Sequence, residues 1–281
     1  MIAHLHKGII CREHRAIEII GGSKRDLEKA VMRQKIKSVD WLLNNSRSIR
    51  MERGLMALFS EWRARAKKAL TEAYAHAMKV DDDIVDQILR RLLSEAFSVD
   101  AIDELTPDLI RTFKEAGIAA IAEIGFDATP AMLEQVDAAA VQYAADHGAD
   151  LVTQIGETTR AEMRGLVVGA VETGLSPQAF ADDIEEAFGF SDARALMISR
   201  TELAFAHTRG NIEGWKESGQ VERKKWIVAQ DRYCDACAAL AEQVVDLDED
   251  FKSEEFGDVD APPLHPNCRC DIVAVMSKEE T

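Results

Sequence analysis

The stretch LHPNCRC, residues 264–270, brings three potential metal ligands together: His265, Cys268 and Cys270. A second pair, Cys234 and Cys237, stands earlier in the chain in the C-x-x-C spacing. Two thiolates at that spacing can bind one ion from a single turn. Cys268 and Cys270 are two residues apart, so an extended chain would point both side chains to the same face. The five residues therefore predict a single site that closes the end of the chain.

Zinc is the metal that such a site predicts, because zinc takes four Cys or His ligands in structural sites. This chain offers five candidates. Either one of them is spare, or His265, which precedes Pro266 and is biased towards an extended conformation, orients the site without binding the ion. Two alternatives stay open, namely disulfide bonds and plain buried thiols. The opening residues show no signal-peptide pattern, and in an intracellular protein clustered cysteines indicate metal more often than disulfides.

A catalytic zinc is not favoured by the sequence. Zinc deaminases carry H-x-E upstream of P-C-x-x-C, whereas no histidine here is followed by x-Glu and the C-x-x-C precedes His265. Catalytic zinc also keeps one position for water and uses three protein ligands. This site offers five candidate ligands, which is more than a catalytic site needs. The chain has no H-E-x-x-H, Walker A or G-x-S-x-G motif. We therefore expect a protein that is not an enzyme.

Charge divides the chain unevenly. Residues 1–80 hold 17 Lys and Arg against 8 Asp and Glu, a net charge of +9. Because the whole chain holds 34 against 50, residues 81–281 hold 17 against 42, a net charge of −25. The basic segment 1–80 is either a surface that contacts nucleic acid or an acidic partner, or the solvated face of its helices. No apolar run reaches the roughly 18–20 residues of a membrane span, so no membrane contact is expected.

Helical patterns fill the chain up to about Gly219. A run over about 51–78 repeats apolar residues at helical spacing. Thr-Pro or Ser-Pro pairs predict helix starts at Thr106, Thr129 and Ser176, and Ser191 predicts the cap of one long helix. From residue 220 the pattern changes to short strands, at 223–229, in EQVVDL and in CDIVAVM, with an acidic loop between the last two. The predicted fold class is mostly α, with a small C-terminal α+β unit closed by the Cys/His cluster.

A resemblance adds to this reading. The residues Arg200-Thr201-Glu202, Trp226, Asp231, Cys234, Cys237 and Leu240, followed by HPNCRC, resemble the head-morphogenesis domain of the phage Mu F protein family. The likeness covers roughly residues 150–277. The family usually has a glycine just after its C-x-x-C-x-x-L, as a turn into the next strand, and here Ala241 and Glu242 follow Leu240. The local turn geometry is the feature that this departure calls into question.

The resemblance implies a minor head protein inside the virion, at the portal vertex, that acts in head morphogenesis, DNA packaging or ejection. On this basis residues 1–149 form a helical region that docks on the portal protein or the major capsid protein, with a possible contact of segment 1–80 to packaged DNA. Residues 150–281 form the Mu F-like domain, with the Cys/His-stapled β unit at 220–277. The expected location is the phage head interior, and the host cytoplasm during assembly.

The motif residues receive expected roles. Arg200 either ties its helix to the Cys/His unit through charge-assisted hydrogen bonds or is a plain surface residue. Glu202 and Arg209, seven apart, share a helix face, and Trp215 and Trp226 belong to the core. Two other functions compete with the structural one. They are a zinc-dependent nucleic-acid-processing enzyme or toxin-like domain, and a zinc-ribbon DNA-binding module, which the strongly acidic stretch 231–260 disfavours.

Overall fold

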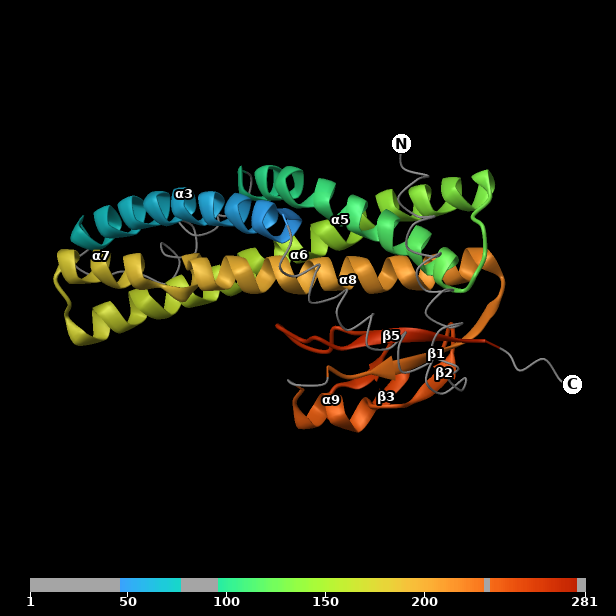
Figure 1. Ribbon diagram of the computed structural model, residues 1–281. Helices are drawn as coiled ribbons and strands as arrows, with labels where there is room; N and C mark the ends of the chain where they lie inside the picture. Colours follow the sequence, from blue (N-terminus) through green and yellow to red (C-terminus); the bar gives the residue numbers. More distant parts are fainter. Residues whose placement is uncertain (1–45, 77–95, 230–232, 277–281) are drawn as a thin grey trace, which may run out of the picture.

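The computed structural model describes residues 46–76, 96–229 and 233–276. The helices form an elongated bundle, and the strands form a small unit alongside α8 (Figure 1). The helices are α3 (Ser46–His76), α5 (Ala96–Glu123), α6 (Pro130–Thr173), α7 (Pro177–Glu186) and α8 (Asp192–Ser218), with a short 3-10 turn η1 (Phe188–Phe190) before α8. The predicted fold class, mostly α with a small C-terminal α+β unit, is confirmed.

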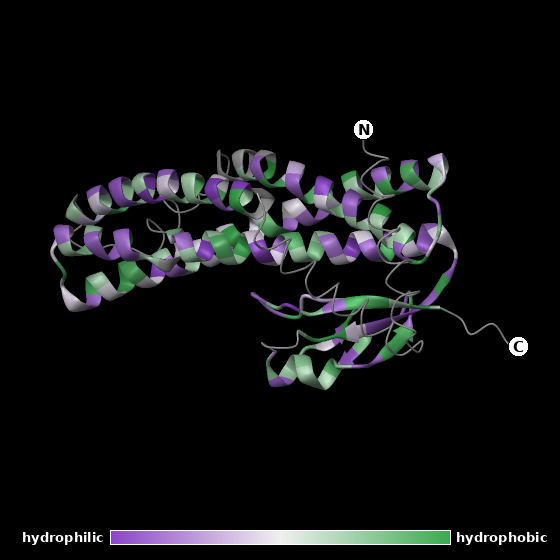
Figure 2. Cartoon of the chain, viewed as in Figure 1, coloured by the Kyte–Doolittle hydropathy of each residue, from purple (hydrophilic) through white to green (hydrophobic). Residues whose placement is uncertain are grey.

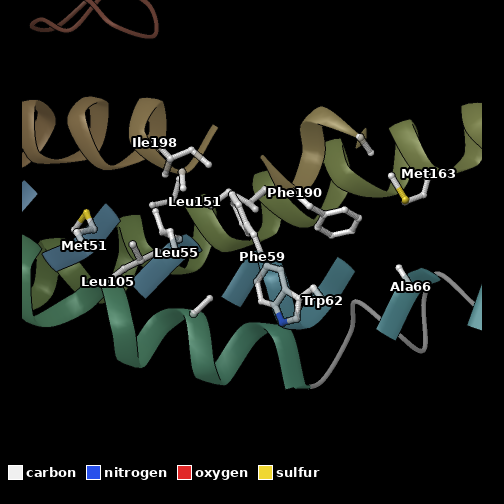
Figure 3. Packing of buried hydrophobic residues seen from close by; sticks show 14 of the residues in the cluster. Met51, Leu55, Phe59, Trp62, Ala66, Leu105, Leu151, Met163, Phe190 and Ile198 are labelled. Carbon is white, nitrogen blue, oxygen red and sulfur yellow. The ribbon is translucent and has the colours of Figure 1, made fainter. Parts of the chain in front are cut away.

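The bundle core is made by apolar residues that recur every three or four positions. On α3 these are Met51, Leu55, Phe59, Trp62, Ala66 and Leu70, all at most 4% exposed. They meet buried residues of α5, α6 and α8, among them Leu105, Leu151 and Ile198 (Figure 3). Polar residues are interspersed with apolar ones along each helix (Figure 2). Within the described ranges, no helix combines the length and apolar character that crossing a membrane requires.

Helix starts follow the predicted capping residues at three of four positions. The hydroxyls of Thr129, Ser176 and Ser191 accept hydrogen bonds from backbone N–H groups in the first turns of α6, α7 and α8. The prediction for Thr106 is wrong, because Pro107 lies inside α5. Packing explains why the helix continues: Leu105 and Leu109 are fully buried in the bundle core, and this tertiary contact outweighs the local cost of proline.

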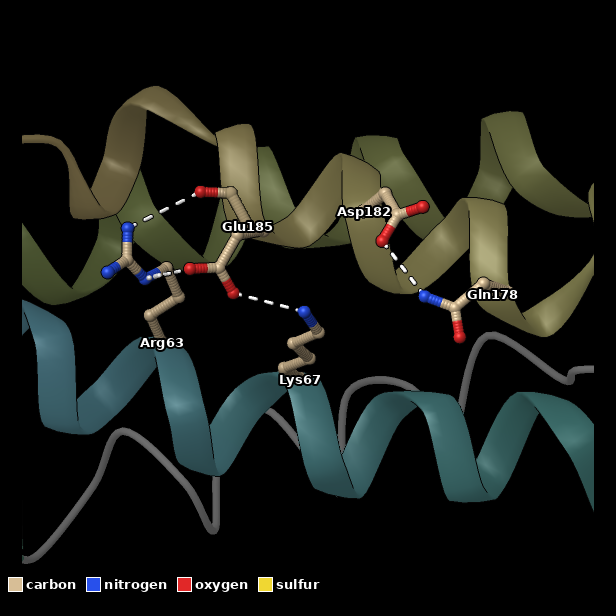
Figure 4. A network of polar contacts seen from close by, with 5 residues as sticks. All are labelled: Arg63, Lys67, Gln178, Asp182 and Glu185. Atoms are coloured by element: carbon tan, nitrogen blue, oxygen red, sulfur yellow. Dashed lines mark hydrogen bonds and ion pairs between the residues drawn. The ribbon is translucent and has the colours of Figure 1, made fainter.

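Ion pairs hold α7 against α3 at the far end of the bundle. Glu185 of α7 lies 3.4 Å from Arg63 and 3.1 Å from Lys67 of α3, and Gln178 donates to Asp182 within α7 (Figure 4). The Lys67 ammonium lowers the pKa of the Glu185 carboxyl. Such exposed pairs contribute about 1 kcal/mol or less, so they orient α7 more than they stabilise it.

The C-terminal unit contains two small sheets and one short helix. Strands β1 (Val221–Ile227), β2 (Val244–Asp246) and β5 (Asp271–Met276) form an antiparallel sheet in the order β2-β1-β5. Helix α9 (Asp235–Leu240) follows β1. The segment predicted as an acidic loop contains a hairpin instead, in which β3 (Phe251–Ser253) pairs with β4 (Gly257–Val259). Trp215 and Trp226 are fully buried in the core of this unit, as expected.

Helix α6 runs without a break through residues 149 and 150, where the sequence placed a domain boundary. Most of the basic segment 1–80 and the motif residue Asp231 lie outside the described residues. Helix α3 carries seven Arg and Lys residues, and four of them form ion pairs inside the chain. Arg50 pairs with Asp108, Arg65 with Glu61, and Arg63 and Lys67 with Glu185.

Helices α5 and α8 touch through their backbones. A Cβ atom built on Gly210 would lie 2.2 Å from the carbonyl oxygen of Phe113, and one built on Gly214 would lie 2.2 Å from the carbonyl oxygen of Gly117. Real Cβ atoms do not approach oxygen this closely, and the obstacle is backbone rather than a flexible side chain. Both positions therefore require glycine, although glycine costs about 1 kcal/mol in a helix relative to alanine.

Substitution of Gly210 and Gly214 tests the backbone contact between α5 and α8. We expect Gly210→Ala or Gly214→Ala to lower the free energy of unfolding by about 3 kcal/mol, because α5 and α8 must move apart. Gly169→Ala in α6 is the matched control: a Cβ there meets nothing within 4 Å, so helix propensity should raise stability by about 1 kcal/mol. Urea denaturation measures both changes. Equal effects of the three substitutions would contradict a backbone contact.

The family glycine after C-x-x-C-x-x-L is replaced here by a strained residue. Glu242 has φ 67°, in the left-handed region that glycine favours. Its N–H donates to the Trp226 carbonyl oxygen at 3.1 Å, which joins the end of α9 to β1. The chain thus makes this turn with a non-glycine residue in the left-handed conformation.

Glu242→Gly should accordingly stabilise the protein by about 0.5–1 kcal/mol, since relief of the left-handed strain exceeds the entropy lost by glycine on folding. The same substitution at Ala241, where φ is −54°, should destabilise by about 0.5–1 kcal/mol because it adds only the entropy cost. Thermal unfolding of the two variants beside the parent chain measures the difference. A loss of stability in Glu242→Gly greater than the ~1 kcal/mol that the surface Lys225–Glu242 ion pair can contribute would show that the left-handed conformation carries no strain.

Candidate metal centre

The first half of the Cys/His cluster lies at the start of α9. Cys234 is the N-cap of this helix, and its sulfur accepts from the Cys237 N–H at 3.5 Å. Cys234 is exposed, whereas Cys237 lies one turn further on and is buried. The C-x-x-C spacing therefore places both sulfurs on the side of α9 that faces the second half of the cluster.

The second half is built on a β-turn in the HPNC sequence. The Cys268 N–H donates to the His265 carbonyl oxygen at 3.0 Å, and Asn267 has φ 61°. Proline at the second position and a left-handed residue at the third are the signature of a type II turn. The turn thus brings His265 and Cys268 to the two ends of one hydrogen bond.

The imidazole of His265 is oriented for metal binding. Its Nδ1 lies 2.9 Å from the Pro266 carbonyl oxygen, and because a carbonyl only accepts, Nδ1 carries the proton. The other nitrogen, Nε2, then has a free lone pair, and it lies 3.2 Å from the Cys234 sulfur and 3.3 Å from the Cys237 sulfur. A backbone carbonyl that fixes the tautomer in this way is typical of metal-bound histidine.

The donor atoms form two groups that share Cys237. Cys234, Cys237 and His265 lie within 4.8 Å of one another, and so do Cys237, Cys268 and Cys270. The sulfurs of Cys237 and Cys268 are 3.7 Å apart, close to the ~3.8 Å that a tetrahedral zinc with 2.3 Å bonds imposes. A surface hollow of about 290 Å³ lies over the cluster and is also lined by Tyr233, Asn267 and Arg269.

The electrostatics of the cluster favour a bound cation. The Cys270 thiol, as a hydrogen-bond donor, lowers the pKa of Cys268 to about 5, against the opposing effect of burial. Burial and the neighbouring Cys268 raise the pKa of Cys237 to about 12. The Cys268 hydrogen bond and burial also raise the pKa of Cys270. Crowded, buried thiols cannot all ionise unless a positive ion offsets their charge, so the donor set fits zinc. The four described cysteines are free thiols, with no disulfide among them.

The segment that carries His265, Cys268 and Cys270 is fixed at both ends. Before it, Asp260 lies 2.6 Å from the fully buried ammonium of Lys224 on β1 and pairs with Arg209 on α8. Burial, together with the charge of Arg209, lowers the pKa of Lys224 to about 8. After it, the buried Asp271 lies 3.8 Å from His207 of α8. None of these anchors is part of a recognisable motif, and the sequence did not predict them.

The remaining motif residues fall in different places. Glu202 lies 2.5 Å from His147 of α6, inside the bundle, and Trp226 is the centre of the C-terminal core. The Nε of Arg200 is buried without a hydrogen-bond partner, so within the described residues the predicted charge-assisted tie is not seen. Its neighbour Thr201 makes the contact instead, by accepting from the Asn267 N–H at 3.3 Å.

Comparison with known proteins agrees with this geometry. Residues 161–273 match the family described as Phage Mu protein F like protein. Over these residues the chain is similar to the Phage Mu F-like family. The match begins within α6 and ends within β5, so it contains α8, the C-terminal unit and all five candidate ligands. This similarity points to a phage head-morphogenesis protein. The comparisons with curated proteins and with solved structures gave no match.

Metal affinity should depend on pH in one direction. Because Cys237 and Cys270 hold their protons in the metal-free protein, an ion that binds either thiolate must release at least one proton. We expect zinc affinity to rise about tenfold per pH unit between pH 6 and 8 for each proton released. Competition against a chelator of known pH dependence measures this slope. An affinity that does not change over this range would contradict binding through these thiolates.

Proposed function

We propose that this protein is a structural minor head protein of a phage, which acts at the portal vertex in head morphogenesis, DNA packaging or ejection. The observation that carries the proposal is the family match, which spans α8 and the whole Cys/His unit. Its work is assembly rather than catalysis. The protein resides inside the phage head and passes through the host cytoplasm during assembly.

The proposed cofactor is one structural zinc ion, held by four of Cys234, Cys237, His265, Cys268 and Cys270. A structural role suits this unit because three of its five strands, β2, β3 and β4, are only three residues long. Three supports favour zinc over disulfides: the 3.7 Å separation of the Cys237 and Cys268 sulfurs, the Nδ1–H tautomer of His265, and the free state of the four thiols. When bound, zinc supplies crosslinking and no reaction step.

The proposed partners are the portal protein and the major capsid protein, contacted through the helical part of residues 1–149. Contact with packaged DNA through segment 1–80 is the weaker element of the proposal. Arg50, Arg63, Arg65 and Lys67 already pair with carboxylates of the chain. A DNA contact would therefore depend on the other basic residues of the segment, among them the exposed Arg53 and Lys68 of α3 and the basic residues of 1–45.

A reconstruction of the phage particle tests the location. We expect density for the long α3, α5, α6 and α8 bundle inside the head next to the portal, and co-purification of the full chain with portal protein. The major capsid protein, tested in parallel, separates a portal contact from general binding to the shell. Copies spread over the outer surface of the head would contradict the proposal.

A further inference from the structure

One peptide group lies at the centre of the HPNC turn, between Pro266 and Asn267. Its carbonyl oxygen accepts from Nδ1 of His265 at 2.9 Å, and its N–H donates to the Thr201 hydroxyl at 3.3 Å. The two groups of a peptide point in opposite directions. Thr201, on α8, therefore holds one side of the peptide while the other side fixes the imidazole.

The orientation of this peptide is what separates a type II turn from a type I turn. If the peptide flipped, the Pro266 carbonyl would turn away from His265, and the Nδ1–H group of the imidazole would lose its hydrogen-bond acceptor. The type II form also needs a left-handed residue at the third position, and Asn267 has a side chain that makes this conformation less favourable than glycine would. An outside contact that favours the type II orientation is thus expected, and Thr201 supplies the described one.

The hydroxyl of Thr201 is itself oriented. It donates to the Met197 carbonyl oxygen one turn earlier in α8 at 2.8 Å, which leaves its oxygen lone pairs free to accept from Asn267. Helix α8, which carries Thr201, is held against α5 by the backbone contact at Gly210 and Gly214. The position of Thr201 is therefore rigid.

We propose that Thr201 is a positioning residue of the metal centre. Its hydroxyl holds the 266–267 peptide in the type II orientation, so that His265 keeps its proton on Nδ1 and presents the Nε2 lone pair to the ion beside Cys234 and Cys237. This inference rests on the proposed zinc. It also gives the middle residue of the Arg-Thr-Glu motif a role that acts through His265 and not through direct contact with the ion.

Removal of the hydroxyl should leave the fold in place. The segment is anchored separately at Asp260, by Lys224 and Arg209, and at Asp271, beside His207. The test variant is therefore Thr201→Val, which keeps the shape of the side chain, with Thr201→Ala as a smaller second variant. Thr201→Ser restores the hydroxyl. Thr158→Val is the matched control, because Thr158 on α6 makes the same bond to its i−4 carbonyl at 2.8 Å and is exposed.

Two readouts on the full chain are needed. Zinc affinity, from chelator competition, should fall about tenfold or more in Thr201→Val and Thr201→Ala, and should stay within about twofold of the parent in Thr201→Ser and Thr158→Val. In the metal-free protein, ¹⁵N spectra of labelled histidine should show His265 with its proton on Nδ1 in the parent, and a mixture of tautomers in Thr201→Val. The His265 signal is assigned by its loss in His265→Asn.

The outcomes separate the two claims. Parent-like affinity and tautomer in both hydroxyl-free variants would overturn the role of Thr201. Failure of Thr201→Ser to restore them would overturn it as well, because the effect would then come from shape and not from the hydroxyl. If the parent chain binds no zinc, the proposed cofactor is wrong, and the tautomer measurement still decides whether Thr201 orients His265.

Discussion

The backbone contact between α5 and α8 at Gly210 and Gly214 is the constraint on which the other features of this protein depend. Helix α8 has more contact with α5 than with any other element, and at the crossing two helix backbones approach without side chains between them. Such an approach fixes both the distance and the register of the two helices. Any residue on the remaining faces of α8 is thereby held in a defined place.

Helix α8 belongs to two cores at once. Its first half contributes Ile198, Leu203 and Ala206 to the bundle core, and its second half contributes Ile212 and Trp215 to the core of the C-terminal unit. The faces between them carry Thr201, His207 and Arg209, which contact the segment from Asp260 to Asp271. One helix therefore connects the bundle, the strand unit and the ligand-bearing turn, and the family match includes this helix together with the cysteines.

Helix caps, which depend on neighbouring residues, can be predicted from this sequence. Contacts between residues far apart in the chain cannot. The caps at Thr129, Ser176 and Ser191 depend on bonds within four residues, and they were predicted. Pro107 was misplaced because burial of Leu105 and Leu109 outweighs a local preference. The β3–β4 hairpin was missed because its strands are three residues long and rich in charge. The contacts of Thr201 with Asn267 and of Asp260 with Arg209 join residues far apart in the chain, and no spacing rule reveals them.

We propose above that four of the five Cys and His residues hold one zinc ion, which joins α9 to the HPNC turn. Native mass spectrometry of the full chain, purified under reducing conditions and without chelator, tests this most directly. We expect one zinc per chain and no disulfide among Cys234, Cys237, Cys268 and Cys270. A metal-free chain in which these cysteines are protected as disulfides would contradict it.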